Sequence, residues 1–167
     1  MYTEENRGIG RIASAALVAA MVVCASAALA ETAHPAGPAG GTADLVIHVG
    51  NVSPKGGIMR LGVYDAAGYP DDKNPIASAD VPATPGETVI TLTGLAPGAY
   101  AIEAYQDVNS NDRMDKSWIG LPLEPYGFSR NARPVLSKPG FDRVRFTLAA
   151  GRNVQTLKLQ NSDVPGE

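Results

Sequence analysis

Residues 94–105 read Gly-Leu-Ala-Pro-Gly-Ala-Tyr-Ala-Ile-Glu-Ala-Tyr, a turn followed by an alternating run. Pro97-Gly98 predicts a tight turn, because proline fixes φ at the first corner and glycine accepts a positive φ at the second. After the turn, apolar residues alternate with residues that face the other way, a period of two that is typical of a half-buried β-strand. We expect Tyr100 to place its hydroxyl on backbone groups at the corner, as a tyrosine corner does.

The same alternation recurs along the chain. Runs of this kind, separated by Gly, Pro, Asn and Asp, lie at 45–49, 59–64, 89–92, 143–148 and 156–159. No stretch of helical periodicity free of Gly or Pro reaches ten residues after residue 30. About seven short strands predict an all-β protein with a single antiparallel β-sandwich, immunoglobulin-like or prealbumin-like. A partly open barrel is the alternative.

The amino terminus is typical of a targeting segment. Arg7 and Arg11 precede an uncharged apolar run from Ile12 to Ala30, which ends in Ala28-Leu29-Ala30. A charged start, an apolar middle and a small-residue exit predict a secretory signal peptide over residues 1–30. The alternative is a retained membrane anchor, for which the alanine-rich run is marginal because a span needs about 20 apolar residues.

Cleavage after residue 30 leaves no membrane span and no cysteine, since Cys24 is the only one in the chain. The formal net charge is −3, and nucleic acid is excluded as a partner because phosphate binding requires a basic surface. We expect a periplasmic or secreted protein without disulfides. The rest of the chain divides into a flexible linker at 31–43, the sandwich domain at 44–160 and a tail at 161–167.

The stretch Asp107-Val-Asn-Ser-Asn-Asp-Arg-Met-Asp115 carries oxygen-bearing side chains at alternate positions. A hard cation such as Ca²⁺ takes six to eight oxygen ligands, which a short loop supplies when its alternate side chains fold inward. Aligned with the twelve-position calcium loop, the ligands are four side chains and one main-chain carbonyl: Asp107, Asn109, Asn111 and Asp115, with the carbonyl of Arg113. The spacing therefore predicts a Ca²⁺ site.

Two positions depart from that calcium loop. Asp112 stands where glycine usually makes a sharp turn, although Asp tolerates left-handed backbone better than most residues. Trp118 stands where a bidentate Glu is usual, so Glu124, the nearest unassigned carboxylate, must replace it. We expect weak binding, with a dissociation constant of about 10⁻⁴–10⁻³ M. The alternative is an Asn/Asp-rich turn that satisfies itself through its own backbone.

Residues 107–140 carry only weak strand signals, and loops this long in a compact domain are usually functional or disordered. Trp118, Tyr126 and Phe128 argue for order, because disordered segments generally lack aromatic residues. Plugging the end of the sandwich is the more ordinary use of such residues. The alternative is that the three form a platform for a sugar or a peptide.

Catalytic constellations are missing from the sequence. His34 lies in the linker and His48 stands alone in a strand, so no zinc cluster can be assembled. No Gly-x-Ser-x-Gly motif is present to form a nucleophile elbow. We therefore expect that the protein is not an enzyme.

Several motifs together resemble the bacterial domain-of-unknown-function 2141 family. They are Tyr100, Asp107-x-Asn109-x-Asn111-x-x-x-Asp115, Gly120-x-Pro122-x-Glu124-x-Tyr126-Gly-Phe-Ser129, Asn131-Ala132 and the strand after Phe141. The resemblance covers about residues 44–160. It implies a small secreted or periplasmic β-sandwich in the envelope of a Gram-negative bacterium, with no established activity, and it pairs Glu124 with the Asp107–Asp115 loop. Asp112 and Arg130 differ from the family pattern, which usually has Gly and Asn there.

Our first functional hypothesis is an exported, non-catalytic β-sandwich whose loop is stabilised by Ca²⁺, with a role in binding or structure and an unidentified envelope ligand or protein as partner. The alternative is a carbohydrate- or peptide-binding module that uses the aromatic residues of the long loop.

Overall fold

The computed structural model describes residues 41–135 and 137–161, all within one compact unit, His34–Glu167. The predicted signal peptide, nearly all of the linker and most of the tail lie outside the described residues. The described part contains eight β-strands. They are β1 (Ala43–Val52), β2 (Ile58–Tyr64), β3 (Ala77–Pro82), β4 (Gly86–Leu95), β5 (Gly98–Asp107), β6 (Tyr126–Phe128), β7 (Phe146–Leu148) and β8 (Gly151–Lys158). The helical elements are short: η1 (Tyr69–Asp71), η2 (Ser129–Asn131) and α1 (Phe141–Val144).

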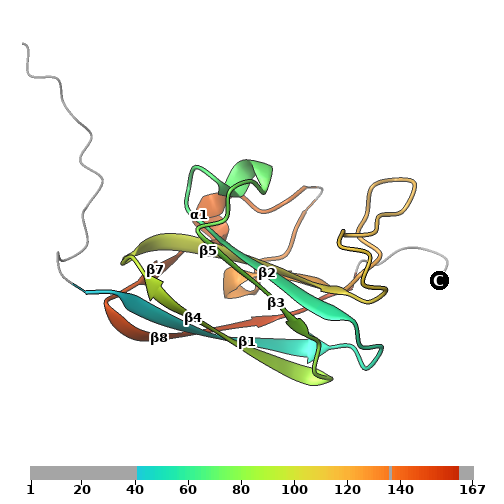
Figure 1. The fold of residues 1–167 in the computed structure, drawn as a ribbon. Helices are drawn as coiled ribbons and strands as arrows, with labels where there is room; N and C mark the ends of the chain where they lie inside the picture. The colour runs from blue at the N-terminus through green and yellow to red at the C-terminus, as the bar shows by residue number, and fades with distance from the viewer. Residues whose placement is uncertain (1–40, 136, 162–167) are drawn as a thin grey trace, which may run out of the picture. The chain divides into compact units, whose positions relative to one another are not determined.

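The strands form two sheets, which confirms the predicted all-β class (Figure 1). One sheet has three strands in the order β4-β1-β8. The other has five strands, in the order β3-β2-β5-β6 with β7 also paired to β5. All strand pairs are antiparallel except β1 and β8, which run parallel. The prediction of purely antiparallel sheets is wrong for this pair. A hairpin forces its two strands to run antiparallel, but β8 follows a strand of the other sheet, so its connection allows a parallel direction.

The hydrophobic core lies between the two sheets. Along each long strand, alternate side chains are buried, as the period of two predicts. The core cluster draws on the inner faces of both sheets, with Leu45, Ile47 and Val49 from β1, Met59, Leu61 and Val63 from β2, and Ile102 from β5 among its members.

The turn before β5 has the predicted tyrosine corner but a different backbone from the predicted one. The hydroxyl of Tyr100 donates to the carbonyl of Ala96 at 3.0 Å, which confirms the corner. The positive φ lies at Gly94, at 75°, and not at Gly98. Gly98 is needed for space, because a Cβ there would lie 3.1 Å from the ring of Tyr100. The tyrosine packed over the turn explains this glycine.

The run at 143–148, predicted as one strand, is divided in two. α1 ends at Val144 and β7 begins at Phe146. Pro139-Gly140 precedes the helical turn, and the N–H of Arg143 donates to the carbonyl of Gly140 at 2.9 Å. Val144 therefore leaves the main core and is buried in a second cluster with Tyr69 and Ala101.

This second cluster covers part of the outer face of the five-stranded sheet. Residues 129–145, which we call the covering segment, contribute Ala132, Phe141 and Val144 to it. Figure 1 shows α1 and the long loop that follows β5 outside the two sheets. No helix in the described part of the chain has the length and apolar character needed to span a membrane.

Candidate functional site

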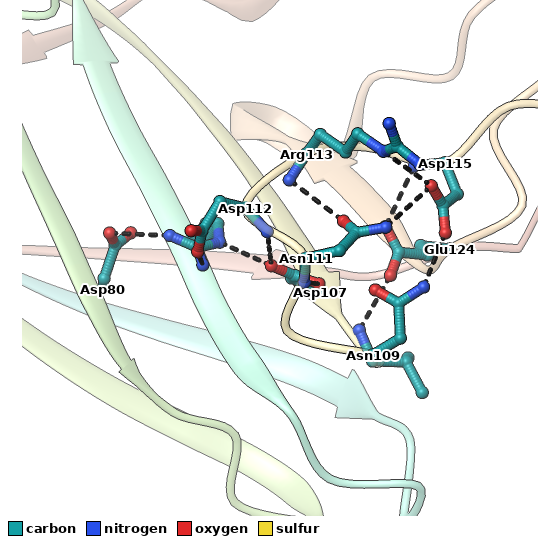
Figure 2. Close-up of polar contacts among 10 residues, drawn as sticks. Asp80, Asp107, Asn109, Asn111, Asp112, Arg113, Asp115 and Glu124 are labelled. Atoms are coloured by element: carbon teal, nitrogen blue, oxygen red, sulfur yellow. Dashed lines mark hydrogen bonds and ion pairs between the residues drawn. The ribbon is translucent and has the colours of Figure 1, made fainter.

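The long loop, residues 108–125, is built around the carboxylate of Asp107 at the end of β5. Its side chain is fully buried, and Arg60 of β2 donates Nε to Oδ2 at 2.8 Å. The backbone N–H groups of Asn111 and Asp112 donate to the two oxygens of the same carboxylate at 3.0 and 2.9 Å. Figure 2 shows the loop turning over Asp107, with Asp112 and Asn111 beside it. The first loop ligand predicted from sequence is therefore the centre of the turn.

These contacts stabilise the charged form of Asp107. Burial alone raises the pKa of this carboxyl, but the hydrogen bonds from Arg60 and the two N–H groups outweigh burial and hold its pKa below the ordinary value. Arg60 also donates to Asp80 at 2.9 Å and contacts Asp112, so one guanidinium joins three carboxylates. The charges at the start of the loop are thus mutually satisfied.

Asp115 collects the amide groups of the loop. Asn111 and Asn109 donate Nδ2 to its two oxygens at 3.0 and 2.7 Å, and Nε of Arg113 lies 3.4 Å from Oδ1. The hydrogen bonds from Asn111 and Asn109 lower the pKa of Asp115. The N–H of Arg113 in turn donates to Oδ1 of Asn111 at 3.2 Å.

Glu124 joins the two ends of the loop. It is 5% exposed, and its oxygens accept the N–H of Val108 at 2.8 Å and the N–H of Asp115 at 3.2 Å. A buried carboxylate that satisfies two otherwise unpaired backbone donors fixes the loop against the sheet. Glu124 therefore lies beside the Asp107–Asp115 loop, next to Asp115 and Asn109 (Figure 2).

The sharp turn of the loop lies at residues with left-handed backbone. Ser110 has φ of 55° and Asp112 has φ of 66°. The expected glycine-like conformation is thus adopted at Asp112. Arg130, the second departure from the family pattern, also has a positive φ, at 61°.

The structure thus brings together the side chains predicted to bind Ca²⁺. Carboxylate and amide oxygens are the right chemistry for a hard cation. In their present orientation, however, the amides of Asn109 and Asn111 donate nitrogen to Asp115. The oxygens of Asp107 already accept three donors, from Arg60 and two backbone N–H groups. Within residues 41–135 and 137–161, no three His, Cys, Asp or Glu side chains converge as a metal site. The Ca²⁺ site stays a prediction, and the contacts present are those of the self-satisfied turn.

The three aromatic residues of the predicted platform occupy two places. Trp118 is 96% exposed at the tip of a hairpin, in which the N–H of Ser117 donates to the carbonyl of Leu121 at 2.8 Å. Tyr126 and Phe128 lie on β6 with their rings edge to face, 6.0 Å between centroids. The structure therefore keeps Tyr126 and Phe128 together and places Trp118 apart from them.

A groove of about 1060 Å³, which we call the outer groove, lies on the outer face of the five-stranded sheet. Its floor comes from strand residues that alternate with the core, and its edges come from the long loop and the covering segment. Those that matter here are Arg60, Glu103, Tyr105, Tyr126, Phe128 and Lys116. Trp118 does not line it.

One end of the groove is held by Lys138 of the covering segment. Its ammonium contacts Asp72, Glu103 and the carbonyl of Tyr69, and lies 3.9 Å from the centroid of the Tyr69 ring. Burial raises the pKa of Glu103 to about 7, although Lys138 opposes the shift. Lys138 touches Oε1 of Glu103 without hydrogen-bond geometry, so this buried oxygen is held by charge alone.

Sequence reasoning named Tyr126 and Phe128 as platform residues but missed the other residues of the groove. Arg60, Glu103 and Tyr105 belong to alternating runs and lie on the strand face opposite the core. Their polar or aromatic character on that face was the sequence signal that could have indicated a binding surface. Lys138 gave no such signal, because its partners Asp72 and Glu103 are distant in sequence.

The family comparison agrees with the motifs quoted from the sequence. A family model described as "Uncharacterized protein conserved in bacteria (DUF2141)" matches residues 47–156. No curated protein and no solved structure matches the chain. Because the matched residues are more than half of the 167 in the chain, the protein belongs to the bacterial domain-of-unknown-function 2141 family.

Proposed function

We propose that this protein is an exported, non-catalytic β-sandwich of the bacterial envelope that binds a ligand in the outer groove. The observation that carries the proposal is the groove itself, about 1060 Å³ in volume, with an aromatic and charged floor on a sheet face. Ligand sites are typically concave, with aromatic side chains and a few placed polar groups. The export part is tested by the mass of the protein recovered from the periplasm, which should begin at Glu31.

The charges in the groove support binding and not catalysis. Arg60 is held by Asp107 and Asp80, and Lys138 by Asp72 and Glu103. A nucleophile or general base must reach the substrate in a reactive protonation state. Side chains that are paired in this way position a ligand and present no activated nucleophile.

The binding proposal is tested by amide NMR with a panel of soluble oligosaccharides and short peptides. A ligand of the outer groove shifts the amide signals of β5 and β6 around Glu103, Tyr105 and Tyr126. Replacing Tyr105 by alanine should remove the shifts, while Trp118→Ala, outside the groove, should leave them. Shifts confined to other parts of the protein, or none across the panel, would refute the groove as the binding site.

We further propose that Ca²⁺ binds the long loop and stiffens it at the edge of this groove. Asp107, Asn109, Asn111, Asp115, Glu124 and the carbonyl of Arg113 would hold it. Support comes from the clustering of these residues around Asp107 and Asp115. Binding requires the amides of Asn109 and Asn111 to turn their oxygens toward the ion. The charge of Ca²⁺ would then take the place of the hydrogen bonds that the amide nitrogens of Asn109 and Asn111 donate to Asp115.

Thermal unfolding with Ca²⁺ and with a chelator tests this part. At a dissociation constant of about 10⁻⁴–10⁻³ M, 10 mM Ca²⁺ should stabilise the protein by about 1.4–2.7 kcal/mol. Asp115→Asn should abolish the increase, and Mg²⁺ should give much less of it because it demands stricter geometry. Identical melting curves with Ca²⁺ and with chelator would contradict the calcium proposal and leave the groove proposal standing.

A further inference from the structure

We infer that the ligand of the outer groove is an acidic oligosaccharide, a hydroxyl-rich chain that carries carboxylates. The inference rests on the proposed binding function and assigns its ligand class. It follows from four features of the groove: the spacing of its aromatic residues, the polar groups between them, the paired backbone of its floor and the unpaired cations at its edges.

The aromatic residues follow the register of the sheet. Tyr105 of β5 lies directly opposite Tyr126 of β6, and Phe128 lies opposite Glu103. All three rings are partly exposed on the outer face. Neighbouring strands are about 4.8 Å apart, which is close to the repeat of one sugar unit in an extended chain. The C–H faces of successive sugar rings can therefore stack on rings from successive strands.

Polar groups lie in the same cross-strand rows. Arg60 of β2 lies opposite Tyr105, and Gly62 lies opposite Glu103. Gly62, between Glu103 and Ser78 of β3, carries no side chain, and the ring of Tyr64 lies over it, 2.6 Å from where a Cβ would stand. An oligosaccharide presents hydroxyls at the edges of its rings, where carboxylate and hydroxyl groups can donate to and accept from them.

The floor is a sheet face, and this favours a saccharide over a peptide. The backbone groups of β2 and β5, the inner strands of the floor, are engaged in pairing on both sides. A peptide that binds by adding a strand needs a free sheet edge. Along β2 and β5, only side chains are available to a ligand.

The charges of the groove favour an acidic ligand. The three acids that line it each contact a cation: Asp80 contacts Arg60, and Asp72 and Glu103 contact Lys138. The remaining lining cations, Lys116 and Arg133, contact no carboxylate among the described residues. Arg60 and Lys138 each serve more than one carboxylate, so the cations left for a ligand are Lys116 on the long loop and Arg133 on the covering segment. A guanidinium pairs well with a carboxylate in two parallel hydrogen bonds.

The inference is tested with a hyaluronan hexasaccharide, which alternates glucuronate and N-acetylglucosamine, against uncharged chitohexaose of the same length. Titration calorimetry and amide NMR should show hyaluronan binding in the groove at least about tenfold more tightly than chitohexaose, equivalent to about 1.4 kcal/mol. Its affinity should fall with salt, because the added contacts are ionic.

Paired variants separate the two contributions. Lys116→Gln with Arg133→Gln should reduce hyaluronan affinity about tenfold and remove most of its salt dependence. Tyr105→Ala with Tyr126→Ala should weaken both sugars. Arg152→Gln, an exposed arginine on β8 away from the groove, and Trp118→Ala are the matched controls and should keep the parent affinity.

Each outcome decides the inference. Chitohexaose binding as tightly as hyaluronan overturns the acidic class. A peptide that binds the groove while neither sugar does overturns the saccharide, and in both cases the groove stands as a binding site. If no probe shifts the groove signals, both this inference and the proposed function fail.

Discussion

The long loop and the covering segment border the same sheet face, but different forces hold them in place. The long loop is held by buried carboxylates, Asp107 and Glu124, that accept backbone N–H groups. The covering segment is held by an apolar cluster around Tyr69 and Val144 and by the caged ammonium of Lys138. The difference shows two ways in which a β-protein can hold a long connecting segment in one conformation. One is to satisfy the segment's backbone donors, and the other is to bury its aromatic surface.

The two regions should therefore respond to different perturbations. Carboxylates with lowered pKa values keep the long loop ordered until strongly acidic pH, since Asp107 and Asp115 ionise below their ordinary values. The covering segment touches Glu103, whose pKa is raised to about 7. A change of pH near neutrality should therefore alter the stability of the covering segment and leave that of the long loop unchanged.

The largest expected effect comes from removing the centre of the long loop. Asp107→Ala leaves the buried part of Arg60 without its partner and two backbone donors without an acceptor. We expect a loss of about 3–5 kcal/mol in the free energy of unfolding, measured by urea denaturation. Asp80→Ala is the matched control, because it also removes a carboxylate from Arg60 but from a side chain that is 58% exposed. Its loss should stay below about 1 kcal/mol, and equal losses would show that Asp107 has no special role.

The second effect is a pH dependence located at the covering segment. Glu103 has an ordinary pKa of 4.5 and a pKa of about 7 in the fold. The folded protein holds this proton more tightly than the unfolded chain, so the stability it contributes is complete below pH 4.5 and is lost as pH rises through 7. We expect the free energy of unfolding to fall by roughly 2–3 kcal/mol between pH 4.5 and pH 8.

Glu103→Gln should remove most of that slope, because the amide does not titrate. The titratable groups that face Glu103 are Lys138, Asp72, Tyr64 and Tyr69, and none of them is changed by the substitution. Asp142→Asn, a carboxylate that is 90% exposed, is the control and should keep the parent slope. A slope that persists in Glu103→Gln would assign the pH dependence to another group.

The smallest effect sharpens the comparison at the start of the covering segment. Arg130 has a φ of 61°, a conformation that asparagine tolerates better than arginine. Arg130→Asn should raise the free energy of unfolding by about 0.5–1 kcal/mol. Arg152→Asn, made on strand β8, should bring no gain because asparagine is disfavoured in strands. If Arg130→Asn instead lowers the free energy of unfolding, contacts of the arginine side chain stabilise the fold by more than its left-handed backbone conformation costs.

The parts of the fold that could be predicted from the sequence are those in which apolar residues recur with a local period of two. Alternation at residues 45–49, 59–64 and 100–105 identified β1, β2 and β5, and Tyr100 identified the corner. β3 was missed because its inward residues are mostly small alanines that are only half-buried on an edge strand, although they alternate regularly with exposed residues. The run at 143–148 was misread, because Val144 is buried outside the main core and its apolar character suggested the wrong face.

The candidate site divides in the same way. The spacing from Asp107 to Asp115 and the pairing with Glu124 could be predicted, because the residues lie within one loop or were joined by a family motif. The outer groove could not, since Arg60, Glu103 and Lys138 meet only after strand pairing brings distant residues together. Which distant strands become neighbours decides which side chains face a ligand, and no local pattern shows that pairing.

The parallel pairing of β1 with β8 bears on how the chain acquires its structure. β1, the central strand of its sheet, finds one neighbour at the very end of the domain, with Ala43 beside Gly151 and Gly50 beside Lys158. Contacts of such sequence separation form slowly, because a long loop must close before they can contribute. A nascent chain therefore lacks one of the three strands of this sheet until residues 151–158 have been synthesised, so this layer is completed late in folding.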